Sequence, residues 1–328
     1  MQAETRPLHI GADVAKDEIV VACEEQHFAP HGIANRRPAL AAFLKAVPPG
    51  SHIGMESTGS YHELFATLAH KMGFVVFVLN PKDTRHYAKA MGLRGKTDRV
   101  DAKLIARFVD REHAKLHPWI PPTPEQRQLG RLLKRRAKLS TIKAALGQSL
   151  KGLTGFSGEL KALRERVQRV IVRIDANIKT LIAASTERQQ AYTRLLSIPS
   201  VGSVVGSGVL IHLERLPFRD ADAFVAFTGL DPRPDDSGHH HGRRRLSKRG
   251  PSELRRLLYV AAMSAARTEA WKPIYKHYRD QGLSTTAALV ILARRIARTA
   301  WSMYTHKTTF DAERLTKQPS RRCAVQHA

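Results

Sequence analysis

The order of short apolar runs in the first 80 residues is the feature that most constrains this fold. Two strand-like runs separated by a short turn predict a hairpin, and the later runs alternate with segments of helical periodicity. Residues 74–79 are apolar throughout, as expected of a strand covered on both faces. A hairpin followed by alternating strands and helices predicts an α/β layered domain over residues 1–123. The expected strands are 8–14, 18–23, 27–33, 51–56 and 74–79, and the expected helices are 37–47 and 61–72.

Acidic side chains stand on two of these strands and at the start of a later helix. Asp13 lies on the first expected strand, and Glu56 ends the fourth. Asp98 and Asp101 stand three residues apart in a helix start that Thr97 is expected to cap, so both carboxylates share one helix face. Taken alone, this helix start reads equally well as a solvated first turn whose acids favour the helix dipole.

The strand order predicts an RNase H-like sheet, with three antiparallel strands first and parallel strands added later. The first and fourth strands are then neighbours, and the acidic helix packs across the same edge. Converging carboxylates repel one another unless a cation lies between them, and hard divalent cations prefer oxygen ligands. Two such ions about 3.5–4 Å apart stabilise the attacking and leaving oxygens of phosphodiester displacement. We therefore predict a site for Mg²⁺, with Mn²⁺ as the alternative ion, on Asp13, Glu56, Asp98 and Asp101.

Other acids compete for this role but fall in turns or beside charged neighbours. We expect these side chains to be exposed: Asp17, Glu24, Glu25 and Asp83.

The charge balance predicts a polyanionic partner. The chain carries 54 Lys and Arg against 29 Asp and Glu, a formal net charge of +25, for which nucleic acid is the simplest partner. The same excess of positive charge is also compatible with a ribosomal-type protein or a protein that binds membrane surfaces. The chain has two cysteines, Cys23 and Cys323, and no apolar run approaching 18 residues, which predicts a cytoplasmic protein without a membrane span.

The segment 124–186 follows a proline-rich boundary and predicts a coiled-coil helical hairpin or a helix pair shared between subunits. Apolar residues recur at heptad spacing on both sides of a glycine-containing interruption. From Arg127 to Arg173 there are 13 basic and 2 acidic residues, a one-sided run that favours a nucleic-acid backbone over a merely solvated face. The two apolar stripes are Leu132, Leu139 and Leu146, then Leu160, Val167, Ile174 and Leu181.

The last domain is expected over 187–315, mainly helical, with a polar, basic tail at 316–328. Residues 195–214 predict a helix-hairpin-helix-like element whose turn presents backbone amides to DNA phosphates. An ordinary helical turn is the alternative.

A long Pro, Gly and polar loop at 231–250 holds several serines beside clustered arginines. A serine hydroxyl against a phosphate held by guanidinium groups is a candidate nucleophile, once a base or a metal activates it. Chemistry alone does not choose among Ser237, Ser247 and Ser252, although Ser252 reads as an N-cap and Ser247 as a phosphate contact. The neighbouring histidines cannot all face one ion, and their role stays open: His239, His240 and His241.

Several motifs resemble the DEDD transposases of the insertion-sequence one-ten family, whose first domain is similar to RuvC Holliday-junction resolvases. The acid motifs are Gly11-Ala12-Asp13, Met55-Glu56-Ser57-Thr58-Gly59 and the long, specific run from Gly92 to Ala102. The second-domain motifs are Gly229-Leu230-Asp231-Pro232-Arg233, Ser237-Gly238 and Leu246-Ser247-Lys248-Arg249-Gly250.

The resemblance implies a transposase that cuts and rejoins DNA, with Ser237 as the nucleophile that forms a covalent link to DNA. It also implies a guide RNA that pairs with donor and target DNA. The coiled coil would serve dimerisation within a homo-oligomer, a dimer or tetramer in which domains of different subunits complete each site. One rival is a metal-dependent junction resolvase that uses water and needs no serine. Another is a non-catalytic nucleic-acid-binding protein with decayed acids.

Overall fold

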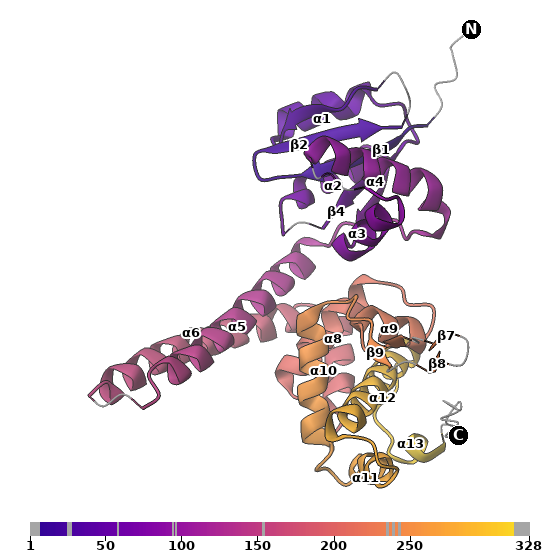
Figure 1. Ribbon diagram of the computed structural model, residues 1–328. Helices are drawn as coiled ribbons and strands as arrows, with labels where there is room; N and C mark the ends of the chain where they lie inside the picture. The colour runs from indigo at the N-terminus through magenta and orange to yellow at the C-terminus, as the bar shows by residue number, and fades with distance from the viewer. Residues whose placement is uncertain are drawn as a thin grey trace. The chain divides into compact units, whose positions relative to one another are not determined.

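The computed structural model of the chain divides into two compact units, Met1–Pro121 and Pro122–Ala328, and each is described by itself (Figure 1). The structure describes residues 7–24, 28–57, 59–93, 95, 97–152, 155–233, 236–237, 240–241 and 244–317. For 236–237, 240–241 and 316–317 it describes the backbone alone. In these ranges no helix combines the length and the apolar character needed to cross a lipid bilayer.

The first unit is built on a mixed sheet of five strands in its described residues, in the order β3-β2-β1-β4-β5. The three strands β1, β2 and β3 pair antiparallel, whereas β4 and then β5 are added parallel. This is the predicted order, and it is compatible with an RNase H-like fold. The strands are β1 His9–Val14, β2 Glu18–Cys23, β3 His31–Ala34, β4 His52–Glu56 and β5 Val75–Leu79.

Alternate residues of each strand point to opposite faces of the sheet, and different helices cover the two faces. Ile10, Ala12 and Ile53 belong to the core formed with α1 and α2. On β5, Val76 joins that core, whereas Phe77 packs with residues of α4, so this strand is covered on both faces as predicted. The helices are α1 Arg37–Ala46, α2 His62–Lys71, α3 Pro81–Ala90, α4 Asp98–Glu112 and the short 3₁₀ turn η1 His113–Lys115.

Two glycines let α4 lie directly on the sheet. A Cβ added at Gly11 would lie 2.1 Å from the Ala102 carbonyl oxygen and 2.2 Å from the Ala106 amide nitrogen. One added at Gly54 would lie 2.3 Å from a methyl of Val109. The backbone of α4 therefore occupies the space that a side chain would take at Gly11 on β1, and side chains of α4 occupy that space at Gly54 on β4.

We expect Gly11→Ala to destabilise the first unit by about 3 kcal/mol, because the new methyl meets helix backbone, which cannot rotate away. Hydrogen exchange of β1 and β4 peptides in the full chain measures this loss. Gly95→Ala is the control, because a Cβ at Gly95 meets nothing within 4 Å. Equal protection of these peptides from hydrogen exchange in Gly11→Ala and Gly95→Ala would contradict the close packing of α4 on β1.

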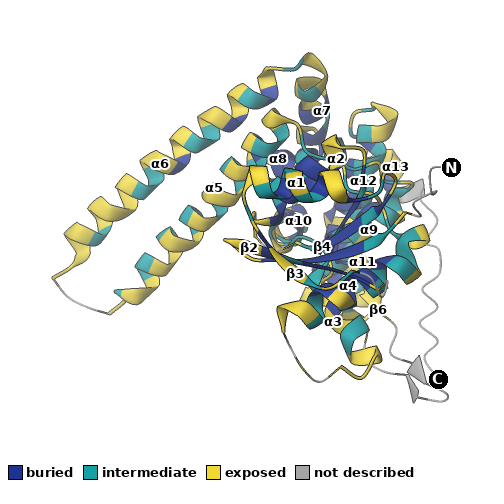
Figure 2. Cartoon of the chain, turned by 90° about the horizontal axis from the view of Figure 1, so that it is seen from above, coloured by how far each residue is buried: buried dark blue, intermediate teal, exposed yellow. Residues whose placement is uncertain are grey.

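The second unit begins with two long helices that pack along each other, α5 Pro124–Ser149 and α6 Ser157–Ala183. Most of their surface is exposed, as Figure 2 shows. Leu129, Ile178 and Ile182 are buried in the core of the second unit. An Arg136–Asp175 ion pair, with a second hydrogen bond of 3.1 Å, joins the two helices. The predicted helical hairpin is thus present, while its coiled-coil geometry and its standing as a separate domain stay predictions.

The rest of the second unit is mainly helical and encloses one large apolar core, in which Trp271 is fully buried. Gly229, at φ 70°, ends α9 in the left-handed conformation that favours glycine. The helices are α7 Thr186–Leu196, α8 Ser203–Arg215, α9 Ala221–Thr228, α10 Ser252–Ala265, α11 Lys272–Asp280, α12 Thr285–His306 and α13 Glu313–Lys317.

His212 on α8 makes this unit sensitive to acid. Burial lowers its pKa to about 4, and Arg215 and Lys134 add to the effect. The unfolded chain, with an ordinary histidine pKa near 6.5, therefore binds more protons than the folded chain between those values. The contribution of neutral His212 to the free energy of unfolding is therefore fully present above pH 6.5. It is lost as the pH drops towards 4, by at most about 3 kcal/mol.

Urea unfolding followed by tryptophan fluorescence at pH 7 and pH 5 measures this loss in the full chain. We expect His212→Gln to flatten the pH dependence, and His306→Gln, which changes an exposed histidine of α12, to leave it in place. If His212→Gln keeps the pH dependence of the parent, His212 is not the cause of the acid sensitivity.

Candidate active site

Asp13 and Glu56 are neighbours on the face of the sheet that α4 covers. Strands β1 and β4 pair in parallel with Ala12 opposite Met55, so the next pair in register is Asp13 and Glu56. Glu56 also lies opposite Leu79, whose side chain packs with residues of α4. Register and alternation together direct both carboxylates to the α4 side of the sheet.

The first turn of α4 brings Asp98 and Asp101 to the same end of the sheet. His9 lies beside Asp110 and Gly11 lies against Ala102 and Ala106, so α4 runs antiparallel to β1. Asp13 is two residues beyond Gly11 on β1, a rise of about 6.6 Å, and about four residues of helix span the same length. Because α4 runs antiparallel, counting back about four residues from the part of α4 that faces Gly11 places Asp13 level with the start of that helix. The predicted cap is present, because Thr97 Oγ1 accepts a hydrogen bond of 3.3 Å from the Val100 amide.

Thr84 orients one of these acids, a role that the sequence did not predict. Its hydroxyl, on α3, donates a hydrogen bond to Glu56 Oε1, and the Thr84 side chain is buried. No local pattern distinguishes this threonine, because its partner lies 28 residues away in the chain.

The four acids are accessible rather than buried. Asp98 is exposed, and Asp13, Glu56 and Asp101 are half-buried. They lie further apart than the ligands of a bound metal ion. In the described part of the chain, the group of three possible ligands whose donor atoms all lie within 4.8 Å of one another is a different one, His9, His52 and His113. An accessible set of carboxylates fits a hard divalent cation that keeps some of its water.

Two of the rival acids, Asp17 and Glu24, are exposed as predicted. Asp17 is exposed in a turn, and Glu24 lies 4.0 Å from the Arg107 guanidinium. Asp83 is half-buried in the first turn of α3, so its predicted exposure is wrong. Glu25 lies outside the described residues.

Short antiparallel pairs organise the loop that carries Ser237. Strand β6 Pro232–Arg233 pairs with β9 Arg245–Leu246 and closes the base of the loop. Further out, β7 Asp236–Ser237 pairs with β8 His240–His241, with Ser237 opposite His240. His239 lies outside the described residues. The backbone of Ser237 is thus placed in a hairpin, and its role as nucleophile stays a prediction.

Two interpretations of the other serines are wrong. Ser247 is buried, and its hydroxyl donates a hydrogen bond to Asp231 Oδ1, so it fastens the base of the loop instead of facing a phosphate. Ser252 is the first residue of α10 and makes no capping hydrogen bond, because Pro251 holds the N-cap position. Pro251 presets the backbone for the helix start without a hydroxyl.

The segment predicted to be helix-hairpin-helix-like forms two helices, α7 and α8, joined by a tight turn. In the turn the Val201 amide donates to the Ile198 carbonyl oxygen at 2.9 Å, and Ser200 adopts φ 83°. Gly206 on α8 lies against Tyr192 of α7, which allows the close packing of the pair. The arrangement agrees with a helical hairpin, and its contact with DNA stays a prediction.

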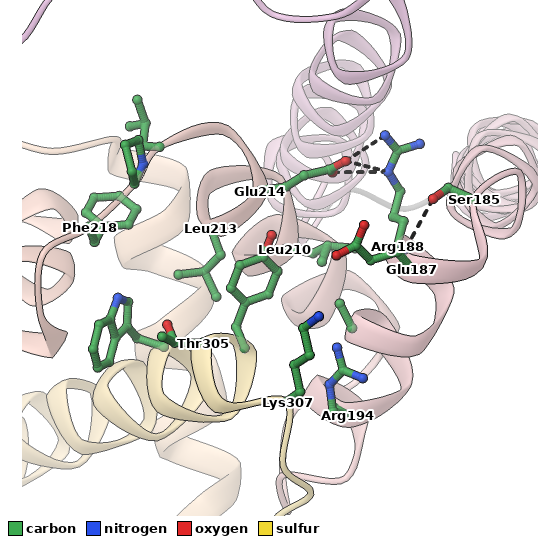
Figure 3. Close-up of a pocket in the computed structure, with 15 residues that line it drawn as sticks. Ser185, Glu187, Arg188, Arg194, Leu210, Leu213, Glu214, Phe218, Thr305 and Lys307 are labelled. Carbon is green, nitrogen blue, oxygen red and sulfur yellow. Dashed lines mark hydrogen bonds and ion pairs between the residues drawn. The ribbon is translucent and has the colours of Figure 1, made fainter.

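A cavity of about 510 Å³ opens among α7, α8 and α12 of the second unit (Figure 3). At its edge Arg188 makes hydrogen bonds of 2.7 to 3.1 Å to the Glu214 carboxylate. Arg188 also donates to the Leu181 carbonyl oxygen at 3.2 Å, which ties the end of α6 to α7 and α8. The cavity is lined by none of the predicted site residues.

Sequence comparisons match two parts of the chain to transposase families. A transposase family model matches residues 10–154, and the model of the transposase IS116/IS110/IS902 family matches residues 192–278. The protein is therefore an enzyme of the transposase and DNA-recombinase class. It carries the transposase domains of the IS116/IS110/IS902 family.

Curated relatives cover most of the chain at low identity. The pilin gene-inverting protein of Moraxella bovis is 27% identical over 266 residues, which are 79% of this chain and 82% of the relative. The probable family 20 transposase of Pseudomonas aeruginosa is 25% identical over 341 residues, 92% of this chain and 98% of the relative. The transposase for insertion sequence element IS1328 of Yersinia enterocolitica is 25% identical over 336 residues, with the same coverage.

Proposed function

We propose that this protein is the transposase of an insertion sequence, which cuts and rejoins DNA strands with an acidic metal site and a serine nucleophile. The observation that carries the proposal is the meeting of Asp13 and Glu56 with the first turn of α4, which holds Asp98 and Asp101. The names of the relatives, transposases and a gene-inverting protein, support the same reaction class.

In this proposal the four carboxylates hold one or two divalent cations, Mg²⁺ or Mn²⁺. When bound, such ions polarise a phosphodiester and stabilise the attacking and leaving oxygens. Thr84 fixes the Glu56 carboxylate through its hydrogen bond. Gly11 and Gly54 set the depth of α4 on the sheet, and so the distance of Asp98 and Asp101 from the strand acids.

Ser237 supplies the nucleophile. Its Oγ–phosphorus bond forms as one phosphorus–deoxyribose oxygen bond breaks, the serine loses its proton, and the departing hydroxyl gains one. The phosphoserine ester keeps the bond energy, so a second DNA hydroxyl can displace the serine and rejoin the strand without an external energy source. The paired strands of the loop hold the backbone of this serine in an ordered hairpin.

The DNA and RNA partners follow from charge and from the family resemblance. Exposed basic residues follow both long helices and suit a sequence-independent phosphate backbone: Arg131, Lys134, Arg135 and Lys138 on α5, and Lys161, Arg164, Arg166, Arg169 and Arg173 on α6. A guide RNA would read the DNA sequence by base pairing and leave the protein to read backbone and shape. We propose that the protein works as a homo-oligomer, a dimer or tetramer.

A recombination assay with the full chain tests this function. The protein is expressed together with the noncoding DNA that flanks its gene, and the RNA that copurifies is sequenced. Protein and RNA are then incubated with donor and target plasmids and Mg²⁺, and new junctions are sequenced. We expect joined products of defined sequence that require both the divalent ion and the copurified RNA.

The rival functions give different results in the same assay. Metal-dependent cleavage of branched DNA without joined products would favour the resolvase-like endonuclease. Binding of DNA without cleavage, under every metal and RNA condition, would favour a non-catalytic binding protein.

A further inference from the structure

Three histidines far apart in the sequence meet at the other end of α4 from the acids. His9 and His52 are the first residues of β1 and β4 and lie opposite each other in the parallel register. His113 follows the last residue of α4, which reaches the same end of the sheet because the helix runs antiparallel to β1. The close packing of α4 therefore brings three imidazoles to one place.

The three rings converge on a common point. Their centroids are 4.9 Å apart for His9 and His52, 4.8 Å for His9 and His113, and 4.8 Å for His52 and His113. One nitrogen from each ring lies within 4.8 Å of the other two. Ligands of a tetrahedral zinc ion lie about 2.0–2.1 Å from the metal and about 3.3 Å from one another. A shift of each nitrogen by about 1 Å towards their common centre would give that spacing.

Neighbouring groups orient these imidazoles in the way that metal-binding histidines require. His113 Nδ1 lies 3.2 and 3.1 Å from the carbonyl oxygens of Val109 and Asp110, which place the proton on Nδ1 and leave the Nε2 lone pair for a ligand. His9 Nδ1 lies 3.4 Å from Asp110 Oδ1, a carboxylate–histidine pair of the kind that supports metal ligands.

His52 gives a separate indication of a ligand. Its Nδ1 is buried, with no hydrogen-bond partner in the described part of the chain, and an unsatisfied buried nitrogen is costly. A metal ion between the three rings would give this nitrogen-rich cluster the ligand that its hydrogen bonds leave open.

We propose that His9, His52 and His113 bind a zinc ion that fastens the C-terminal end of α4 to β1 and β4, with water as the fourth ligand. Imidazole nitrogens favour zinc over magnesium, whereas the carboxylates at the other end of α4 favour magnesium. The helix would then be held by a nitrogen site at one end and an oxygen site at the other. The zinc site has a structural role and does not depend on the proposed recombination activity.

Zinc binding by the full chain tests this site without DNA or RNA. The protein carries no polyhistidine tag, and His239, His240 and His241 are changed to alanine to remove a rival cluster of adjacent histidines. Affinity is measured by competition with a chromophoric chelator, and Co²⁺ absorption reports the coordination geometry. We expect about one zinc ion per chain, tetrahedral or five-coordinate Co²⁺ bands, and no displacement by millimolar Mg²⁺.

Variants locate the ion. We expect His52→Ala and His113→Ala each to weaken zinc binding at least about a hundredfold, and Asp110→Asn, which keeps the three ligands, to weaken it about tenfold. His70→Ala, an exposed histidine of α2, and Asp13→Asn, at the acidic end, should bind zinc as tightly as the parent. The thermal midpoint of the parent should rise with zinc and fall with chelator, whereas His52→Ala should respond to neither.

Two results would overturn the proposal. The first is a parent protein that binds no stoichiometric zinc. The second is zinc binding that His52→Ala and His113→Ala leave within about threefold. If the alanine variants fail to fold, the Co²⁺ spectrum of the parent and the affinity of Asp110→Asn decide the question.

Discussion

Asp13→Asn is expected to lower DNA strand cleavage by the full chain at least about a thousandfold, a loss of about 4 kcal/mol of transition-state stabilisation. The amide keeps the shape of the carboxylate but removes the charge that the proposal assigns to metal binding, at the centre of the acid set. Single-turnover cleavage of labelled DNA in Mg²⁺ measures the effect, with the RNA that copurifies present throughout.

Asp17→Asn is the matched control, because Asp17 is an exposed acid in the turn directly after β1. We expect cleavage within about twofold of the parent for this variant. A thermal midpoint within a few degrees of the parent's would show that Asp13→Asn is folded. Retention of more than about a tenth of the activity in folded Asp13→Asn would remove Asp13 from the metal site.

Ser237→Ala is expected to abolish both the covalent protein–DNA adduct and strand exchange, while DNA binding stays unchanged. The reason is chemical: without the hydroxyl, no phosphoserine ester can form to hold the strand between cleavage and rejoining. Denaturing electrophoresis of labelled DNA detects the adduct, and sequencing of joined products measures exchange.

Ser252→Ala controls for the loss of a serine hydroxyl in the same unit, since Ser252 is exposed and makes no capping bond. It should keep both adduct and exchange. Exchange that persists in Ser237→Ala would refute the serine scheme. DNA cleavage without a covalent adduct, in the parent as well as in Ser237→Ala, would identify water as the nucleophile, as in the resolvase-like alternative.

Local structure followed the sequence closely where the signal was local. The second strand has the predicted bounds, Glu18–Cys23, and Thr97 caps α4 as expected. These features depend on side chains within a few residues of one another, through alternation and capping. The failure at Ser247 has the opposite origin. Ser247 is held by Asp231, 16 residues earlier, and no local pattern identifies that partner.

The histidine site shows the same division. A histidine at the start of two strands is visible in the sequence, but the register that pairs His9 with His52 exists only in the sheet. His113 joins them only because α4 lies against Gly11 and Gly54 and reaches that end of the sheet. The hydrogen bond by which Thr84 orients Glu56 is also a contact between residues far apart in the chain.

By itself the sequence determined the order of strands and helices, the positions of the candidate acids on those elements and the basic character of the long helices. Periodicity, capping and net charge are properties of neighbouring residues, so they can be read without a fold. Only the tertiary structure decided which face of the sheet Asp13 and Glu56 share, where α4 lies on it and which side chains meet at each end of that helix. Those relations depend on strand register and on the space left by two glycines, and both arise from contacts between residues far apart in the chain.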